Sequence, residues 1–454
     1  MDDIKKVIVE QREFFKTNIT LDLDYRLNSL IKLKSLIEER EKDISTALKA
    51  DLGKSEFESY STEIGIVLSE ISFTIKNLKK WAKPKKVKTP ITAFKSNSYI
   101  YAEPYGNTLI IAPWNYPFQL SIAPLIGSIA AGNTAIIKPS STSKETSRVI
   151  EDLINDNFPS SFIHVITGEK SKLLLEEQFD YIFYTGSVSV GKKVMTSAAK
   201  YLTPVTLELG GKSPCIVDSE GELEIFAKRM VWGKFLNAGQ TCVAPDYLLV
   251  QKNVKDSLVK HLTTYIEKFF GKYPLNSKDY GRIVSEKHFD RLVKLLGSGN
   301  VIYGGEYNRK MLYISPTLLD NVSWDNPIME EEIFGPLFPI LEYTSLDEAI
   351  EIVNSHPKPL ALYFFSSNDD KIERVIKCTS YGGGCINDTI MHLSTPYLPF
   401  GGVGNSGMGS YHGKGSFDTF THHKSVLKRS NTFDPDFRYP PYEDKIKLVK
   451  KFLK

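Results

Sequence analysis

Apolar residues recur at helical spacing through the first 80 or so positions of the chain. Two sets of positions follow this spacing: Leu27, Leu30, Ile31 and Leu33, and then Ile64, Val67, Ile71 and Ile75. Because residues three and four apart share one face of a helix, the pattern predicts amphipathic helices. A basic, proline-broken connector follows at residues 79–86, and a solvated surface is the simplest interpretation of its charges.

Beyond the connector, short apolar runs alternate with helical stretches. Residues 108–112, 134–137, 162–166 and 181–184 predict buried strands, and 143–155 predicts one of the helices between them. Such alternation is typical of a parallel sheet covered by helices. A second alternating block spans about 215–387, with a boundary near 207–213. The sequence therefore predicts an α/β protein with two large blocks, which 454 residues allow.

Composition excludes several classes of protein. Hydrophobic residues make up 41% and charged residues 24%, which is ordinary for a globular chain, and a net charge of +3 gives no sign of nucleic-acid binding. Four cysteines are too few for a disulfide framework. We read no signal peptide in the first 15 residues, and Pro124 and Gly127 interrupt the longest apolar stretch, 120–131. We expect a soluble, cytoplasmic protein.

Two segments nearly match nucleotide-binding motifs. Gly402 to Gly407 spells G-x-G-x-x-G, but no strand pattern leads into it and no helical pattern follows, so a structural turn is the better interpretation. Gly186 to Lys193 nearly spells a phosphate-binding loop. Lys193 stands where such a loop needs Ser or Thr to hold magnesium, which argues against NTP hydrolysis. The helical run after it still suits the pyrophosphate of a dinucleotide.

Three further segments carry groups that suit carbonyl chemistry. Cys242 ends Asn-Ala-Gly-Gln-Thr-Cys, although a lone cysteine is more often a buried structural thiol. Glu208 precedes two glycines, which predicts a sharp turn, and an ion pair is the alternative interpretation. Asn115 stands between two prolines, where it is either a turn residue or a donor to an oxyanion. A nucleophile, a base and an oxyanion donor are the minimum set for acyl chemistry.

These segments belong to a set that resembles the aldehyde dehydrogenase superfamily over residues 20–430. The matching motifs, in family order, are Ala112-Pro-Trp-Asn-Tyr-Pro117, Ile137-Lys-Pro139, Tyr184-Thr-Gly-Ser187, Leu207-Glu-Leu-Gly-Gly-Lys212, Gly239-Gln-Thr-Cys242 and Glu331-Glu-Ile-Phe-Gly-Pro336. The runs at 399–414 and 416–421 resemble the class 3 branch, which includes fatty and aromatic aldehyde dehydrogenases.

The resemblance implies a fold and a reaction. A Rossmann-like NAD(P)-binding domain is expected at 1–88 and 107–207, an α/β catalytic domain at 208–405, and a bridging or oligomerisation arm with a tail at 89–106 and 425–454. A homodimer is expected by the same analogy. The implied reaction oxidises a medium- or long-chain aliphatic, aromatic or terpenoid aldehyde to its carboxylic acid, with NAD+ or NADP+ as hydride acceptor.

The resemblance also implies residue roles. Cys242 matches the nucleophile, Asn115 the oxyanion-holding amide and Glu208 the base. Residues matching cofactor contacts are Lys138 at the adenosine ribose, Gly186 and Ser187 at the pyrophosphate, Glu332 and Phe334 at the nicotinamide end, and Trp114. Residues matching the substrate pocket are Tyr116, Trp232 and His412. The implied mechanism needs no metal, and the sequence contains no metal-ligand spacing.

One departure from the family and two alternative functions bear on this interpretation. Many members carry a glutamate, three residues after the lysine matched by Lys138, that repels the 2′-phosphate of NADP. Ser141 stands there, which predicts that NADP+ is usable within about tenfold of NAD+. An acylating enzyme that passes the thioester to coenzyme A is one alternative, and a non-catalytic protein on the same fold is the other. Glu208 argues against the first, because a well-placed hydrolytic base favours water, and intact Cys242, Glu208 and Asn115 argue against the second.

The tail concentrates positive charge. From Lys424 to Lys454 there are nine Lys/Arg against four Asp/Glu, an excess of five, although the whole chain carries only +3. Ile446, Val449 and Phe452/Leu453 share one face of a helix whose other faces carry lysines. This pattern is typical of weak peripheral contact with an anionic membrane. An arm helix packed on a partner subunit, or a solvated end, is the alternative.

Overall fold

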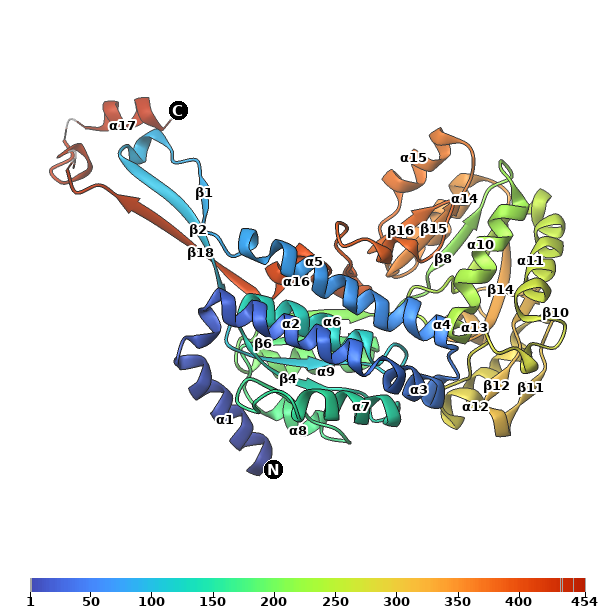
Figure 1. Ribbon diagram of the computed structural model, residues 1–454. Coiled ribbons are helices and arrows are strands. Elements are labelled where there is room, and N and C mark those ends of the chain that lie inside the picture. The colour runs from blue at the N-terminus through green and yellow to red at the C-terminus, as the bar shows by residue number, and fades with distance from the viewer. Residues whose placement is uncertain (1, 433, 435, 444, 454) are drawn as a thin grey trace.

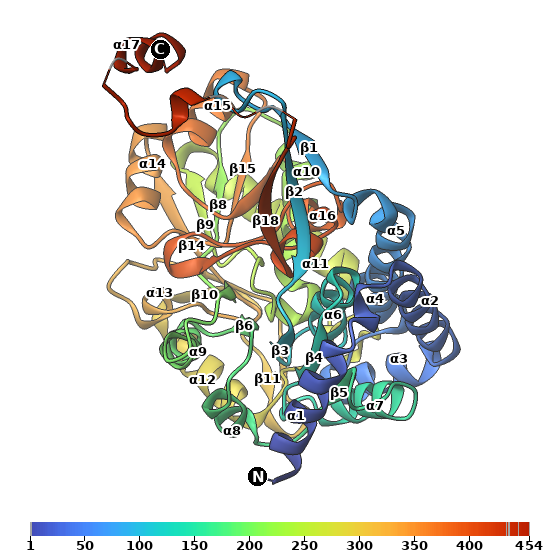
Figure 2. The ribbon, with the colours of Figure 1, turned by 90° about the vertical axis from the view of Figure 1, so that its left-hand side faces the viewer.

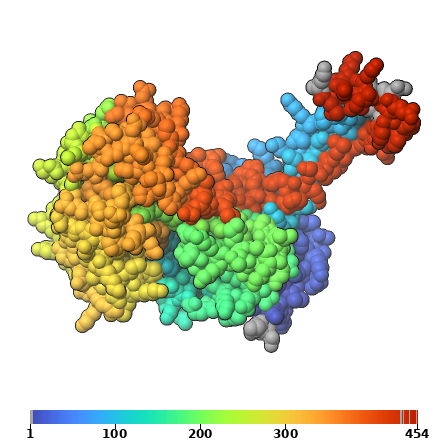
Figure 3. Space-filling view, turned by 180° about the vertical axis from the view of Figure 1, so that it is seen from behind, coloured from blue at the N-terminus to red at the C-terminus, as the bar shows by residue number. Residues whose placement is uncertain are grey.

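The computed structural model describes residues 2–432, 434, 436–443 and 445–453 (Figure 1). Two α/β units lie side by side, and an arm of β-strands projects away from them (Figures 1 and 2). The space-filling view shows the same division, with the C-terminal segment leaving the body along the arm (Figure 3). The chain thus forms a body with two sheets and an arm that stands clear of it.

The N-terminal helices form one wall of the first unit. They are α1 (Asp2–Lys16), η1 (Ile19–Leu21), α2 (Leu23–Glu39), α3 (Glu41–Leu52), α4 (Glu56–Ser59), η2 (Tyr60–Ile64) and α5 (Gly65–Trp81). Leu30 and Leu33 are fully buried, as the helical pattern predicts. Ile31 is 51% exposed, because the core-facing stripe of α2 continues from Leu33 to Ile37 and leaves Ile31 on its outer side.

A six-stranded sheet forms the centre of the first unit, in the order β17-β7-β6-β3-β4-β5. Its strands are β3 (Asn107–Ile111), β4 (Thr134–Lys138), β5 (Ile163–Val165), β6 (Tyr181–Gly186), β7 (Val205–Leu209) and β17 (Gly407–Met408). The connecting helices are α6 (Gln119–Ala131), α7 (Lys144–Asn155), α8 (Ser171–Glu176) and α9 (Val188–Ala199). Strands β3 to β7 pair in parallel. The four predicted strands and the helix at 143–155 are therefore confirmed.

Helix α6 accounts for the long apolar stretch in the sequence. All of its residues are buried, and Pro124 lies inside it. It packs between the sheet and helix α5, so its apolar residues face protein on every side. Among the described residues, no helix is long and apolar enough to cross a membrane.

A seven-stranded sheet forms the second unit, in the order β10-β13-β14-β9-β8-β15-β16. Its strands are β8 (Pro214–Val217), β9 (Tyr247–Gln251), β10 (Asn300–Tyr303), β13 (Thr317–Asp320), β14 (Leu337–Tyr343), β15 (Ala361–Phe365) and β16 (Gly383–Ile386). Its α-helices are α10 (Leu223–Phe235), α11 (Lys255–Phe270), α12 (Glu286–Leu295), the four-residue α13 (Pro327–Glu330), α14 (Leu346–Ser355) and α15 (Asp369–Cys378). The chain passes from one sheet to the other between Leu209 and Pro214, and the α/β architecture is confirmed.

Short elements link these helices and strands. They are η4 (Leu236–Gly239), η5 (Lys252–Val254), η6 (Pro274–Asn276), η7 (Leu296–Ser298), β11 (Tyr307–Asn308), η8 (Arg309–Met311), β12 (Tyr313–Ile314), η9 (Met391–Ser394), η10 (Gly404–Ser406) and α16 (Lys414–Thr419). The G-x-G-x-x-G run forms η10 and then β17, which pairs antiparallel with β7. It opens no long helix, so the prediction of a structural turn is confirmed.

The arm is a three-stranded antiparallel sheet in the order β1-β2-β18. Its elements are β1 (Lys85–Val87), η3 (Ile91–Ala93), β2 (Ser96–Pro104) and β18 (Thr421–Arg429). Segments η11 (Asp436–Arg438) and α17 (Ile446–Phe452) follow near its tip (Figure 1). The arm thus joins two segments that lie more than 300 positions apart in the sequence.

Candidate active site

The loop after β3 is joined to the loop that carries Cys242. Asn115 is 2% exposed, and its Nδ2 donates a hydrogen bond to the carbonyl of Gln240 at 3.0 Å. The backbone carbonyl of Asn115 accepts from Asn237 Nδ2 at 2.8 Å. Beside it, Tyr116 Oη and Thr241 Oγ1 are 2.6 Å apart. Two segments about 125 positions apart are therefore held together by buried hydrogen bonds.

The backbone ahead of Cys242 has an unusual conformation. Asn237 and Ala238 both have φ of 51°, in the left-handed region, and Gly239 follows at 75°. A side chain on Gly239 would collide with the carbonyl of Gly335. The Asn237 N–H donates to Glu58 Oε1 at 2.8 Å, which helps to hold this conformation. Such backbone strain is found mainly at functional sites, where the surrounding structure enforces it.

Glu208 lies inside strand β7, which corrects the expectation that it occupies a sharp turn. Parallel pairing of β7 with β6 places Glu208 opposite Thr185, and the chain turns only afterwards, at Gly210 and Gly211. The side chain is 2% exposed, and neither carboxylate oxygen has a hydrogen-bond partner among the described residues. Burial raises the pKa of Glu208. A buried carboxyl group without a partner is suited to receive a water molecule or a substrate group.

Glu332, which belongs to the second unit, approaches the turn that follows Glu208. A side chain on Gly210 would collide with its carboxylate, so this close approach requires the glycine. The pKa of Glu332 is raised, mainly by burial and next by the charge of Asp246. Burial also raises the pKa of Cys242, followed by the charges of Glu332 and Glu208. Both carboxylates therefore lie close enough to the thiol to act on it electrostatically.

Residues expected at the nicotinamide end lie in one aromatic group. Phe334 has φ of 50° and packs edge-on against Trp114, with ring centroids 5.2 Å apart. The Trp114 ring lies 4.8 Å from that of His288. Asp246 accepts a hydrogen bond from the Ile333 N–H at 2.9 Å, and this contact fixes the segment that carries Glu332 and Phe334.

Residues expected at the cofactor phosphates and ribose lie along the carboxyl edge of the first sheet. The Ser187 side chain does not cap α9, and uncapped N–H groups at a helix N-terminus are suited to bind an anion. Gly186 has φ of 157°, and a side chain there would collide with Tyr184 Oη. Lys138 ends β4 and is 2% exposed. A backbone that approaches closely, a helix N-terminus and a buried ammonium together fit a dinucleotide.

The three expected pocket residues lie in different surroundings. Tyr116 is buried against the Cys242 loop, and burial raises its pKa. His412 is 6% exposed and stacks on Tyr411 with centroids 4.3 Å apart, and burial lowers its pKa to about 4. Trp232 lies on α10 and is 37% exposed. The charges of Glu208 and Cys242 both act on Tyr411, which brings His412 into the neighbourhood of the site.

Sequence reasoning missed a buried ion pair below Asn115. Lys54 and Glu63 are both fully buried, and Lys54 Nζ lies 2.5 Å from Glu63 Oε1. Lys54 Nζ also donates to the carbonyl of Asn115 at 3.1 Å and lies 3.9 Å from the centre of the Tyr116 ring. Glu63 accepts from the Phe118 N–H at 2.9 Å. No local pattern in the sequence distinguishes these two charges from solvated ones.

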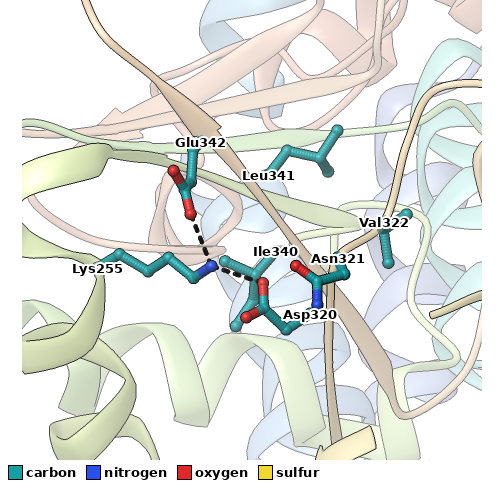
Figure 4. Close-up of a pocket in the computed structure, with 7 residues that line it drawn as sticks. All are labelled: Lys255, Asp320, Asn321, Val322, Ile340, Leu341 and Glu342. Atoms are coloured by element: carbon teal, nitrogen blue, oxygen red, sulfur yellow. Dashed lines mark hydrogen bonds and ion pairs between the residues drawn. The ribbon is translucent and has the colours of Figure 1, made fainter. Parts of the chain in front are cut away.

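A surface pocket on the second unit is a separate feature (Figure 4). Lys255 lies at its centre, 2.7 Å from Asp320 Oδ1 and 2.7 Å from Glu342 Oε1. The two carboxylates flank the ammonium, and none of the residues discussed above lines the pocket. This pocket therefore offers no alternative centre for carbonyl chemistry.

Comparison with known proteins agrees with the geometry. The aldehyde dehydrogenase family profile matches residues 1–426. The 4,4′-diaponeurosporen-aldehyde dehydrogenase of Staphylococcus aureus is 52% identical over 458 residues and covers 100% of both chains. The dimeric NADP-preferring aldehyde dehydrogenase of Mus musculus is 46% identical over 445 residues, covering 97% of this chain and 98% of that one. A substrate-bound structure of Staphylococcus aureus AldH superposes with a TM-score of 0.98 at 52% identity, covering 99% of each chain.

The chain therefore belongs to the aldehyde dehydrogenase family. It is an oxidoreductase that converts an aldehyde to a carboxylic acid with NAD+ or NADP+ as acceptor. Relatives named as family 3 members also match it, which confirms the resemblance to the class 3 branch.

Proposed function

We propose that Cys242 is the nucleophile, Asn115 the oxyanion donor and Glu208 the hydrolytic base of this aldehyde dehydrogenase. The observation that carries the proposal is their convergence at one buried place. The Asn115 amide is fixed beside the Cys242 loop. The Glu208 carboxylate, whose oxygens have no hydrogen-bond partner among the described residues, lies close enough for its charge to act on the Cys242 thiol. The three side chains come from different segments of the chain, so no single turn or strand explains why all three are present.

In the proposed reaction, the Cys242 thiolate attacks the aldehyde carbon and the carbonyl oxygen becomes an oxyanion. Asn115 Nδ2 and the backbone N–H of Cys242 donate to that oxygen, and each preorganised donor lowers the barrier by about 3 kcal/mol. Asn115 needs little rearrangement, because its amide already has a buried partner in Gln240. When bound, the nicotinamide of NAD(P)+ accepts the hydride that leaves the aldehyde carbon, and a thioester remains on Cys242.

Glu208 then takes a proton from the water that hydrolyses the thioester. Its burial supports this role, because a carboxylate with a raised pKa is a stronger base. Glu332 is the second candidate base, since after burial its charge has the largest effect on the pKa of Cys242. Attack requires a neighbouring carboxylate to take the thiol proton, because burial and both charges keep the thiol protonated.

We propose that the cofactor binds along the carboxyl edge of the first sheet. We assign Lys138 to the adenosine ribose, and Gly186 and Ser187 with the start of α9 to the pyrophosphate. We assign Glu332, Phe334 and Trp114 to the nicotinamide end. The close approach of Gly210 to Glu332 and the left-handed conformation of Phe334 support a functional site here, because strained backbone is found mainly at such sites.

For substrate, we propose a medium- or long-chain aliphatic, aromatic or terpenoid aldehyde that enters past Tyr116, Trp232 and His412. The relative that is 52% identical is named for 4,4′-diaponeurosporen-aldehyde, which supports an aldehyde with a terpenoid-like chain. The partly exposed Trp232 offers apolar surface on α10 for such a chain.

We further propose a cytoplasmic homodimer that uses the arm, with a tail that makes weak membrane contact. The 46% identical relative is named dimeric, and β18 presents a long strand at the edge of the arm sheet. In α17, Ile446 is 56% exposed and Lys447, Lys450 and Lys451 are exposed beside it. The side chain of Phe452, predicted to share this helix face, lies outside the described part of the structure.

Reduction of NAD+ with hexanal or benzaldehyde, run with and without coenzyme A, tests the proposed reaction. We expect aldehyde-dependent NADH formation, the free carboxylic acid as product, and no dependence on coenzyme A. An acyl-coenzyme A product would identify an acylating enzyme instead. No turnover with any aldehyde in a chain-length series would favour the non-catalytic alternative.

A further inference from the structure

Two neighbouring loops leave the first sheet at its carboxyl edge. Strands β4 and β5 are parallel partners, with Ala135 opposite Ile163 and Ile137 opposite Val165. Residues 139–143 follow β4 and residues 166–170 follow β5, and together we call them the rim. Ligands of doubly wound sheets bind beyond this edge of the strands, so groups on the rim are placed to contact one.

A hydrogen bond joins the two halves of the rim. Ser141 Oγ donates to Glu169 Oε1. Glu169 follows Gly168, whose φ of 80° forms a tight turn in which the Lys170 N–H donates to the Gly168 carbonyl at 3.0 Å. The turn and the Ser141 hydroxyl thus fix the direction in which the Glu169 carboxylate points.

The Glu169 carboxylate also acts on the buried ammonium group at the end of β4. Lys138 Nζ donates to the carbonyl of Pro139 at 2.6 Å. Burial lowers the pKa of Lys138, the charge of Glu169 raises it, and the charge of Lys170 lowers it. The hydrogen-bonded Ser141 hydroxyl and Glu169 carboxylate therefore lie on the rim, and the charges of Glu169 and Lys170 both reach the Lys138 ammonium.

This arrangement bears on the prediction that Ser141 makes NADP+ usable, which assumed that no negative charge lies near the ribose. Position 141 itself carries no charge, and a neutral position predicted relaxed cofactor choice. The negative charge is nevertheless present, because the next loop of the sheet supplies it to the Ser141 hydroxyl. No local sequence pattern predicts this contact, because Ser141 and Glu169 are 28 positions apart.

We propose that Glu169, held by Ser141, selects NAD+ over NADP+. The proposal rests on the proposed cofactor site, in which Lys138 contacts the adenosine ribose. A ribose 2′-hydroxyl donates a hydrogen bond to the carboxylate, and such bonds to charged acceptors are stronger than neutral ones. A 2′-phosphate brings about 1.5 to 2 negative charges to the same place and is repelled. Without the carboxylate, Lys138 and Lys170 would attract that phosphate.

Direct titration of both cofactors measures how strongly Glu169 favours binding of NAD+ over NADP+. Binding of NAD+ and of NADP+ to the wild-type chain, to Glu169→Gln and to Glu176→Gln is followed by calorimetry. Glu176 is the matched control because it is exposed at the far end of α8 and its replacement removes the same charge. We expect the ratio of Kd for NADP+ to Kd for NAD+ to fall at least tenfold in Glu169→Gln and to stay within twofold in Glu176→Gln.

A change of less than threefold in Glu169→Gln, or an equal change in Glu176→Gln, would overturn the proposal. Lys138→Ala separates this failure from a failure of the proposed cofactor site. If Lys138→Ala weakens both cofactors and Glu169→Gln leaves the ratio unchanged, only the selection by Glu169 is wrong. If Lys138→Ala weakens neither cofactor, the ribose does not lie at this rim. Because the repulsion is electrostatic, the effect of Glu169→Gln should also shrink as salt is raised.

Discussion

The surroundings of Cys242 and the rim differ in how their polar groups are held. Around Cys242, Asn115 and Asn237 are buried and joined by hydrogen bonds between distant segments. On the rim, the contact between Ser141 and Glu169 is exposed and joins two neighbouring loops. Replacing a polar group is costly where its partners are buried and mild where water replaces them. Changes near Cys242 should therefore abolish function or stability, whereas changes on the rim should adjust selectivity.

The largest effect is expected from Cys242→Ala. Removal of the sulfur leaves no nucleophile for the thioester route, so aldehyde oxidation should fall below about one per cent of the wild-type rate. Cofactor binding should persist, because the assigned cofactor contacts do not involve the thiol. Steady-state turnover and NAD+ titration measure the two properties. The mechanism is wrong if the variant keeps more than a few per cent of turnover, and Cys378→Ala, at an exposed cysteine, serves as the control.

The next largest effect is expected from Lys54→Met. Removing one partner of a buried ion pair leaves an uncompensated charge, which costs about 3–5 kcal/mol of stability. Glu63 would be left with its backbone donors, and the Asn115 carbonyl would lose one of its partners. Chemical unfolding of the variant measures the loss of free energy. The double variant Lys54→Met/Glu63→Gln removes both charges and should recover part of it. A loss below 1 kcal/mol would show that the pair is not needed to hold this region.

A smaller and more selective effect is expected from Glu208→Gln. Hydrolysis of the thioester should slow by more than tenfold, with hydride transfer affected less, so a pre-steady-state burst of reduced cofactor should appear or grow. A base acts when deprotonated, and burial raises the pKa of Glu208. Hydrolysis in the wild-type chain should therefore speed up as pH rises, and this pH dependence should be absent in Glu208→Gln. If the burst vanishes instead, Glu332 becomes the better candidate for the base.

The smallest effect is expected from truncation after Pro441, which removes α17. The arm and tail lie away from both sheets (Figure 1), so aldehyde oxidation should change less than twofold. Co-sedimentation with anionic liposomes at low salt should fall, and the difference should disappear at high salt. Equal sedimentation of both forms, or none by either, would rule out the membrane role.

Local patterns predicted much of the fold. The β-branched and aromatic runs at Thr108 and Tyr181 became strands β3 and β6, since buried parallel strands need continuous apolar residues. Ile31 belongs to the apolar pattern that predicted a helix and is nevertheless exposed, because spacing alone does not fix the edge of the buried face of a helix. The arm joins β2 to β18, and no local pattern encodes a pairing over that distance.

The candidate site was predicted less completely than the fold. Family motifs named Cys242 and Glu208, but the strand position of Glu208 depends on its pairing with β6 and β17. Lys54 and Glu169 were missed because a charged side chain is informative only once its partner and burial are known. Both act through contacts with segments that are distant in sequence.

Trapping the thioester tests the central claim most directly. Glu208→Gln is mixed with benzaldehyde and NAD+, quenched in acid within the first turnover, digested and mapped by mass spectrometry. We predict a benzoyl group on the peptide that contains Cys242, in an amount equal to the NADH formed, and none on the peptides that contain Cys215, Cys378 or Cys385. Formation of NADH with no acyl group on Cys242, or with the acyl group on another cysteine, would contradict the account.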